Sequence, residues 1–224
     1  MKNLYICGDS FGYSDPEYGA CWVDILIKKL SNWQVTNLSR VCASNLQIST
    51  QVDHAIKQKP DYIIYLMTTS TREDIPHTVA SLKDMSQRYT NIADPSTDTD
   101  LTSYSIFSLD NTTILSDSQL KLLTEYHKNF FDLDVSIYKS KLICEATLQH
   151  LVDSNIPFVF DQGGFENTNF TGASSTAYFE NYIAHKSAFN LWDYYTTKKH
   201  RPYYHIQDTD VHERVADYYY NLIS

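Results

Sequence analysis

The chain has 224 residues, of which 42% are hydrophobic and 20% are charged, and this composition excludes general disorder and predicts one folded domain over residues 1–224. The formal net charge of −9 argues against nucleic acid and anionic membrane surfaces as partners, because both would repel the protein. The sequence shows neither a signal peptide nor an apolar run of membrane-spanning length, so we expect a cytoplasmic protein.

Four short apolar runs, each bounded by polar or turn residues, predict buried β-strands at residues 4–7, 35–38, 62–67 and 157–160. Longer stretches separate them, and this alternation is typical of a parallel sheet with helices packed on both faces. The sequence therefore predicts an α/β fold.

Apolar residues recur at helical spacing between these strands and after the last one. The spacing predicts helices at residues 21–30, 48–56, 75–82, 120–130, 143–152 and 211–222. A stretch rich in Ser, Thr, Asp and Asn at residues 90–118 predicts a polar surface insertion, and residues 163–175 predict an irregular loop after the last strand.

The turn Gly8-Asp9-Ser10 follows the first predicted strand and presents a hydroxyl at its carboxyl end. A serine hydroxyl is an effective nucleophile only when a base removes its proton, so a catalytic Ser10 requires a histidine from elsewhere in the chain. His205, in the loop before the C-terminal helix, is the predicted base. The alternative is a tight turn in which Asp9 or Ser10 caps the following helix.

Residues 8–13 resemble the first of four sequence blocks of the SGNH, or GDSL-type, hydrolases. Residues 37–39 and 42–45 are similar to the second block, residues 68–72 stand where the third is expected, and the His205 loop stands where the fourth is expected. The resemblance spans nearly the whole chain in the expected order. It implies a three-layer α/β/α sandwich with a parallel, flavodoxin-like central sheet, and it implies ester hydrolysis.

In that family, the oxyanion is held by the N–H of the nucleophilic serine, a second-block glycine N–H and a third-block asparagine side chain. The resemblance places Cys42 at the glycine position and Ser70 at the asparagine position, so two of the three donors are changed. We expect Asp9 to accept N–H groups of its own loop and Arg72 to lie at a solvated helix start. Both also remain candidate substrate-binding residues.

The family's catalytic histidine usually follows an aspartate by three residues, whereas Pro202 stands three residues before His205. His212 is the alternative base. We prefer His205 because His212 falls near the first turn of the predicted terminal helix. Asp208 is the candidate acid, and without it the serine and histidine would act as a dyad.

The resemblance implies a serine esterase that acts through an acyl-enzyme. The breadth of that family alone implies the substrate class, a small ester such as an O-acetyl group on a carbohydrate. The changed oxyanion and acid positions favour an alternative, a catalytically silent scaffold used for binding or assembly. A nucleotide binder has less support, because no Walker sequence and no GxGxxG pattern occurs. Scattered cysteines, and histidines without metal-site spacing, predict no disulfide framework, no metal and no cofactor.

Overall fold

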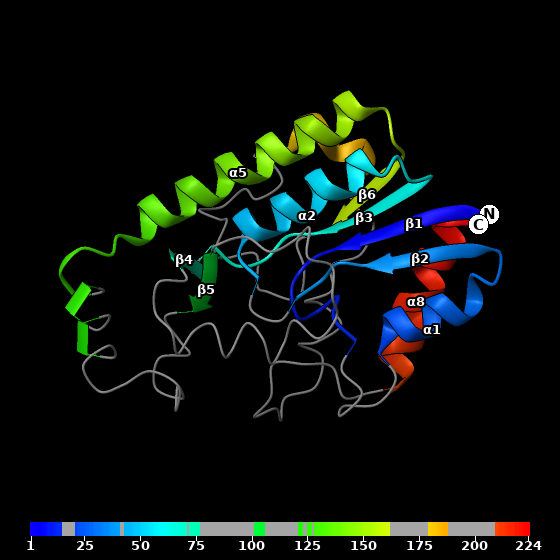
Figure 1. Cartoon of the computed structure of the whole chain (residues 1–224), viewed down its shortest axis with the longest axis horizontal. Coiled ribbons are helices and arrows are strands. Elements are labelled where there is room, and N and C mark those ends of the chain that lie inside the picture. The colour runs from blue at the N-terminus through cyan, green and yellow to red at the C-terminus, as the bar shows by residue number, and fades with distance from the viewer. Residues whose placement is uncertain are drawn as a thin grey trace.

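A computed structural model describes residues 1–14, 21–40, 43–70, 72–76, 101–105, 121–122, 125–126, 128–161, 179–187 and 209–224. Its main sheet has four parallel strands in the order β2-β1-β3-β6. The strands are β1 (Lys2–Cys7), β2 (Trp33–Asn37), β3 (Tyr62–Leu66) and β6 (Phe158–Asp161), and Figure 1 shows them side by side. The four predicted strands are thus confirmed, with ends shifted by one or two residues.

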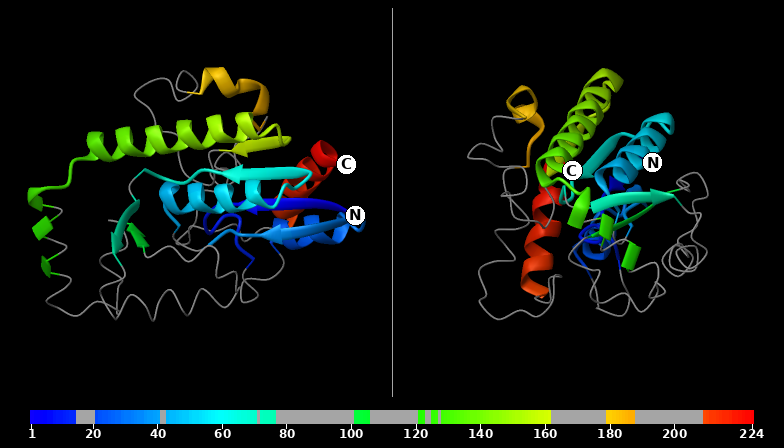
Figure 2. Two further views of the ribbon diagram at one scale, coloured as in Figure 1. Left: turned by 45° about the horizontal axis from the view of Figure 1, so that its top comes forward. Right: turned by 90° about the vertical axis from the view of Figure 1, so that its left-hand side faces the viewer.

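Helices cover both faces of this sheet (Figures 1 and 2). Helix α1 (Trp22–Lys29) packs with the C-terminal helix α8 (Thr209–Ile223) on one face. Helix α2 (Asn45–Lys57) packs with α5 (Leu133–Ser154) on the other, and the short 3₁₀ helix η5 (Glu180–His185) follows β6 along the chain. The predicted three-layer α/β fold is therefore confirmed.

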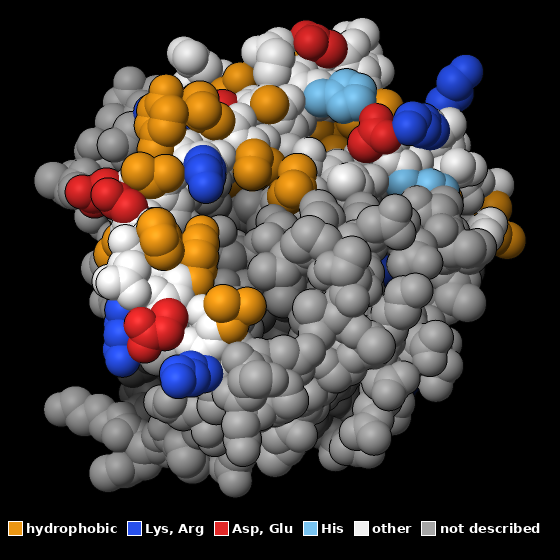
Figure 3. Space-filling model, turned by 60° about the vertical axis from the view of Figure 1, so that its left-hand side comes forward, with side chains coloured by type: hydrophobic (Ala, Val, Ile, Leu, Met, Phe, Trp, Pro, Cys, Tyr) orange, Lys and Arg blue, Asp and Glu red, His pale blue; other side chains and the backbone are white. Residues whose placement is uncertain are grey.

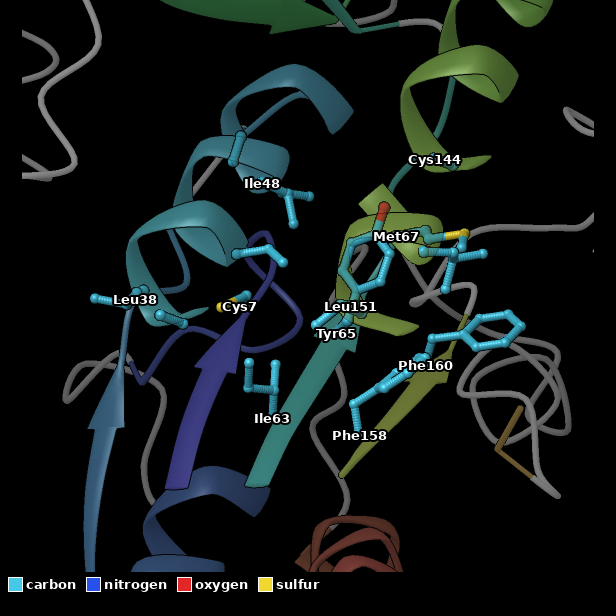
Figure 4. Close-up of a cluster of buried hydrophobic side chains, with 14 of the residues drawn as sticks. Cys7, Leu38, Ile48, Ile63, Tyr65, Met67, Cys144, Leu151, Phe158 and Phe160 are labelled. Atoms are coloured by element: carbon cyan, nitrogen blue, oxygen red, sulfur yellow. The ribbon is translucent and has the colours of Figure 1, made fainter. Parts of the chain in front are cut away.

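Alternation along the strands divides the hydrophobic core into two clusters. On β3, Ile64 and Leu66 face α1 and α8, whereas Ile63 and Tyr65 face α2 and α5. Figure 4 shows the second cluster, in which Tyr65 and other side chains of the sheet pack with residues of the same helices. Because both faces of the central strand β3 are buried, it appears in the sequence as a continuous apolar run, whereas β2 at the edge of the described sheet contains polar residues and is only partly buried.

The prediction of a helix at residues 75–82 is wrong at its start. Residues Arg72–Pro76 form strand β4, which pairs antiparallel with β5 (Leu101–Ser105) in a separate two-stranded sheet. Proline fixes its own backbone and disfavours the helical region for the residue before it, so Ile75 is directed toward an extended conformation. Strand β5 lies inside the predicted insertion, and Val79, Leu82, the other insertion residues and residues 163–175 lie outside the described residues.

The other predicted helices are found at the expected places in the chain, but their first and last residues differ from the prediction. Helix α5 begins ten residues before the predicted 143, where the Asp132 side chain caps it by accepting the N–H groups of Asp134 and Val135. The described residues 121–122, 125–126 and 128–129 are helical, in agreement with the predicted helix at 120–130. No helix among the described residues is long and apolar enough to cross a membrane.

The spacing that predicts the C-terminal helix puts Val211, Val215, Tyr218 and Leu222 on one face, and in α8 Val211 and Tyr218 do pack against the core cluster. Val215 is buried as predicted, but Leu222 is 44% exposed, and Ala216, Tyr219 and Ile223 are buried in its place. Tyr219 packs against Trp22 with ring centroids 5.0 Å apart, and this contact with α1 fixes the rotation of α8.

Part of the described surface is apolar. Leu122 and Phe130 are more than two-thirds exposed, and Tyr138 on α5 is 60% exposed. Figure 3 shows exposed apolar side chains on one face of the molecule, with charged side chains among them.

Candidate active site

The four parallel strands bring their carboxyl ends to one edge of the sheet, which is where α/β folds place ligand-binding loops. Ile6 is in register with Asn37, and Cys7 with Tyr65. Leu66 is in register with Asp161. The segments that follow β1, β2 and β3, at residues 8–12, 38–40 and 67–70, therefore meet at this edge.

The backbone of the turn after β1 is fixed from two sides. The Gly8 N–H donates to Gln51 Oε1 at 2.8 Å, and the Gly8 carbonyl accepts from Gln51 Nε2 at 3.2 Å and from the Arg40 N–H at 3.1 Å. A Cβ atom at Gly8 would lie 2.9 Å from Leu66 Cβ, so a side chain does not fit here. The turn is closed by a hydrogen bond from the Gly12 N–H to the Asp9 carbonyl at 3.1 Å.

Ser10 lies at the tip of this turn and is half-buried, so part of its side chain remains accessible. Its hydroxyl forms no hydrogen bond with another residue of the described segments. A hydroxyl on a rigid backbone at the carboxyl edge of the sheet suits a nucleophile.

Asp9 is fully buried and points into the protein. One carboxylate oxygen accepts the Phe11 N–H at 2.9 Å, and the other accepts the Thr68 hydroxyl at 2.7 Å. The second oxygen also forms an ion pair with Arg72 Nη1 at 3.2 Å. Asp9 thus accepts a loop N–H, as expected, and joins the turn to the segment after β3.

Arg72 does not lie at a solvated helix start, because it begins strand β4 and its side chain is only 6% exposed. The same Nη1 atom that pairs with Asp9 donates to the Ala43 carbonyl at 2.7 Å. Arg72 therefore contacts the turn of Ser10 and the loop that follows β2.

Two asparagines connect the loop after β2 to its neighbours. Asn37 donates from Nδ2 to the Gly12 carbonyl at 2.8 Å and accepts the Ser39 N–H at 3.0 Å. Asn45, at the start of α2, accepts the Thr68 N–H and donates to the Thr68 carbonyl, each at 2.9 Å. The three loops thus form one hydrogen-bonded unit.

Of the two changed oxyanion donors, the Ser70 hydroxyl and the Cys42 N–H, only Ser70 lies among the described residues. Ser70 is buried in the segment after β3, and its carbonyl accepts the Ser136 hydroxyl of α5 at 2.6 Å. Cys42 lies outside the described residues, although the next residue, Ala43, is held by Arg72.

The predicted base His205 and the candidate acid Asp208 also lie outside the described residues. His212 lies in α8, where its Nδ1 accepts the Trp22 N–H at 3.0 Å. A neutral imidazole has one unprotonated nitrogen, so with Nδ1 acting as acceptor the Nε2 atom carries the proton. In this arrangement His212 cannot accept a proton from Ser10 through Nε2.

The described cysteines are poor nucleophiles. Burial raises the pKa of Cys7 far above its ordinary value, and it raises the pKa of Cys144 to about 12. Burial also raises the pKa of Cys21 to about 11, although the backbone hydrogen bond to Asp24 partly offsets this. A thiolate is therefore scarce at neutral pH at all three positions.

Sequence reasoning missed several polar residues that support this edge. Gln51 is buried on the face of α2 that also carries Ile48, Val52 and Ala55, and a glutamine inside an apolar stripe is the signal that could have identified it. Asp161, at the end of β6, is also buried at the carboxyl edge. The predicted strand ended one residue before it.

The structure is similar to the crystal structure of the psychrotrophic esterase EstA from Pseudoalteromonas sp. inhibited by monoethylphosphonate. The TM-score is 0.53 and the sequence identity is 13%, over 99% of this chain and 96% of that chain. No protein-family model and no curated protein matches the sequence. At this identity the likeness concerns the fold, so this chain shares the α/β architecture of an esterase.

Proposed function

We propose that the protein is a serine hydrolase that cleaves carboxylic esters with Ser10 as its nucleophile. The observation that carries this proposal is the turn after β1, which holds an accessible hydroxyl at the carboxyl edge of the sheet on a backbone fixed by Gln51 and Arg40. The fold shared with an esterase supports it.

In the proposed mechanism, the Ser10 hydroxyl attacks the ester carbonyl while His205 takes its proton. The histidine then returns the proton to the departing alcohol, and water hydrolyses the acyl-enzyme by the same route. The Nδ1 hydrogen bond of His212 supports the choice of His205 over His212. Asp208 would orient His205, and without that contact the pair would act as a dyad.

The oxyanion would be held by the N–H of Ser10, the N–H of Cys42 and the hydroxyl of Ser70. A backbone N–H at Cys42 would take the place of the glycine N–H of the family pattern. A serine hydroxyl is shorter than an asparagine amide, and losing one donor costs about a hundredfold to a thousandfold in rate, so we expect modest turnover.

The substrate class we propose is a small ester, such as an O-acetyl group on a carbohydrate. Such a substrate is uncharged at its reacting carbonyl, and the net charge of −9 does not repel it.

The test is labelling by a fluorophosphonate together with hydrolysis of p-nitrophenyl acetate. We expect wild type to be labelled at Ser10 and Ser10→Ala to lose at least about a thousandfold in kcat/KM with its circular dichroism unchanged. Ser31→Ala, which removes an exposed hydroxyl from the turn between α1 and β2, is the matched control and should behave as wild type.

A folded wild type that is neither labelled nor hydrolytic would overturn this proposal and favour the silent scaffold. Equal activity of wild type and Ser10→Ala would remove Ser10 from the mechanism.

A further inference from the structure

We infer that Arg72 is a positioning residue of this site, which holds the loop of the nucleophile and the loop of an oxyanion donor at a fixed separation. The inference rests on the proposed function of Ser10 and goes beyond the resemblance to SGNH hydrolases, which assigned Arg72 no role. Three features of the structure support it.

First, Arg72 contacts both loops through one atom. Its Nη1 lies 3.2 Å from Asp9 Oδ2 and donates to the Ala43 carbonyl at 2.7 Å. Both hydrogens of this nitrogen can therefore be used at once, one toward each loop. The side chain is 6% exposed and Asp9 is fully buried, so water screens this ion pair very little.

Second, each contact is made next to a residue of the proposed machinery. Asp9 precedes Ser10 directly, and its other carboxylate oxygen accepts the N–H of Phe11 on the far side of the serine. Rotation of the Asp9 carboxylate would thus break the hydrogen bond that holds the backbone after Ser10. Ala43 follows Cys42 directly in the chain, so Arg72 holds the residue next to the proposed oxyanion donor.

Third, Arg72 itself is anchored. It is the first residue of β4, and it is in register with Ser105 of β5 in the antiparallel pair. On the Asp9 side, Thr68 donates to the oxygen that Arg72 contacts, and Thr68 is in turn held by Asn45. Both the backbone of Arg72 and the carboxylate that its guanidinium contacts are therefore held in place by other parts of the structure.

Moving either loop away from Arg72 would leave a buried charge of the Asp9–Arg72 pair uncompensated, so the pair resists such movement. Displacement of a reacting group by about 1 Å can cost about a hundredfold in rate. The inference therefore predicts a change in kcat that exceeds any change in substrate binding.

The experiment compares Arg72→Met and Arg72→Lys with wild type, with p-nitrophenyl acetate as substrate and at a temperature well below each Tm. We expect Arg72→Met to lower kcat about a hundredfold and to slow fluorophosphonate labelling of Ser10 equally, while KM changes less than about threefold. Arg72→Lys should recover much of the loss, because its single ammonium nitrogen can replace Nη1. Lys29→Met, which removes a cation from the exposed pair with Asp217, is the matched control and should leave kcat unchanged.

A folded Arg72→Met with wild-type kcat and labelling rate would overturn the inference and leave the proposed function intact. If Arg72→Met does not fold, the same comparison is made with the double variant Asp9→Asn/Arg72→Met, which leaves no buried charge unpaired. Here too a wild-type kcat would overturn the inference. A wild type without labelling or hydrolysis would overturn both the proposed function and this inference.

Discussion

At the scale of single residues, Gly12 and Ser39 show how closely the first two loops approach each other. A Cβ atom at Gly12 would lie 3.0 Å from Leu66 Cδ1 and 3.1 Å from Ser39 Cβ, and would also overlap Ser39 Oγ. The Ser39 hydroxyl is buried and forms no hydrogen bond with the described residues. Position 12 therefore requires a glycine because the loop after β1 packs closely against Ser39 and Leu66, and not because Ser39 needs a hydrogen bond there.

We expect Gly12→Ala to lower the free energy of unfolding by about 1–3 kcal/mol, because the new methyl group overpacks this contact. Ser39→Ala alone should change stability by less than about 1 kcal/mol, since the hydroxyl it removes forms no hydrogen bond with the residues that the structure describes. Urea unfolding of both variants and of the double variant tests this. If the hydroxyl is the main obstacle, Gly12→Ala will be less costly in the Ser39→Ala background, and an equal cost in both backgrounds would contradict that explanation.

At the scale of elements, Asn45 joins three of them. It is the first residue of α2, it pairs with both backbone polar groups of Thr68 after β3, and its Nδ2 donates to Ser140 Oγ of α5 at 2.6 Å. Asn45 is buried among these partners, so one side chain links α2 and α5 to the segment after β3 through hydrogen bonds.

Asn45→Ala should lower the free energy of unfolding by about 3 kcal/mol, because it leaves the N–H and carbonyl of Thr68 buried without partners. Asn221→Ala, on an exposed position of α8, is the matched control and should stay within about 0.5 kcal/mol of wild type. Denaturant unfolding measures both. A cost below about 1 kcal/mol at Asn45 would mean that water or a shifted backbone replaces these hydrogen bonds.

The elements also show where sequence patterns succeed. Short apolar runs located all four strands of the main sheet, most clearly β3 and β6, because a strand buried on both faces has few polar positions to interrupt it. Helical spacing located α1 and α2, but the same spacing failed at Ile75, where Pro76 and the pairing with β5 favour a strand.

At the scale of the whole molecule, each of the two core clusters contains a free cysteine or is packed against one. Cys7 and Cys144 are buried in the cluster beneath α2 and α5, and Cys21 packs against the cluster beneath α1 and α8. Burial raises the pKa of each, to about 12 for Cys144 and about 11 for Cys21, from an ordinary value of 9.0.

This pattern predicts alkaline destabilisation. Below about pH 9 the thiols are protonated in both the folded and the unfolded chain, so their contribution to stability is fully present. Above that pH only the unfolded chain ionises, and stability should fall by about 1.4 kcal/mol per pH unit for each buried thiol until its folded pKa is reached. Urea unfolding at pH 8.5 and 10.5 measures the fall.

Cys144→Ala provides the control for the alkaline effect. This variant is less stable at every pH because it leaves a cavity, but its stability should fall less steeply above pH 9 than that of wild type. Parallel pH profiles for the two proteins would exclude Cys144 as a source of the effect.

The sequence by itself determined the α/β class, the four strands of the main sheet and the position of Ser10 directly after β1. These follow from local patterns, since apolar runs, helical spacing and a Gly-Asp-Ser turn are properties of neighbouring residues. The assignments of His205, Asp208 and Cys42 remain predictions.

Only the tertiary structure decided what surrounds the turn. The pairing of Asp9 with Arg72, the clamp of Gln51 on Gly8 and the hydrogen bond between Trp22 and His212 join segments far apart in the chain. Local patterns cannot reveal such partners, because a polar side chain looks the same in the sequence whether solvent or a distant buried group satisfies it. Folding brings these groups together, and burial then makes each pairing obligatory.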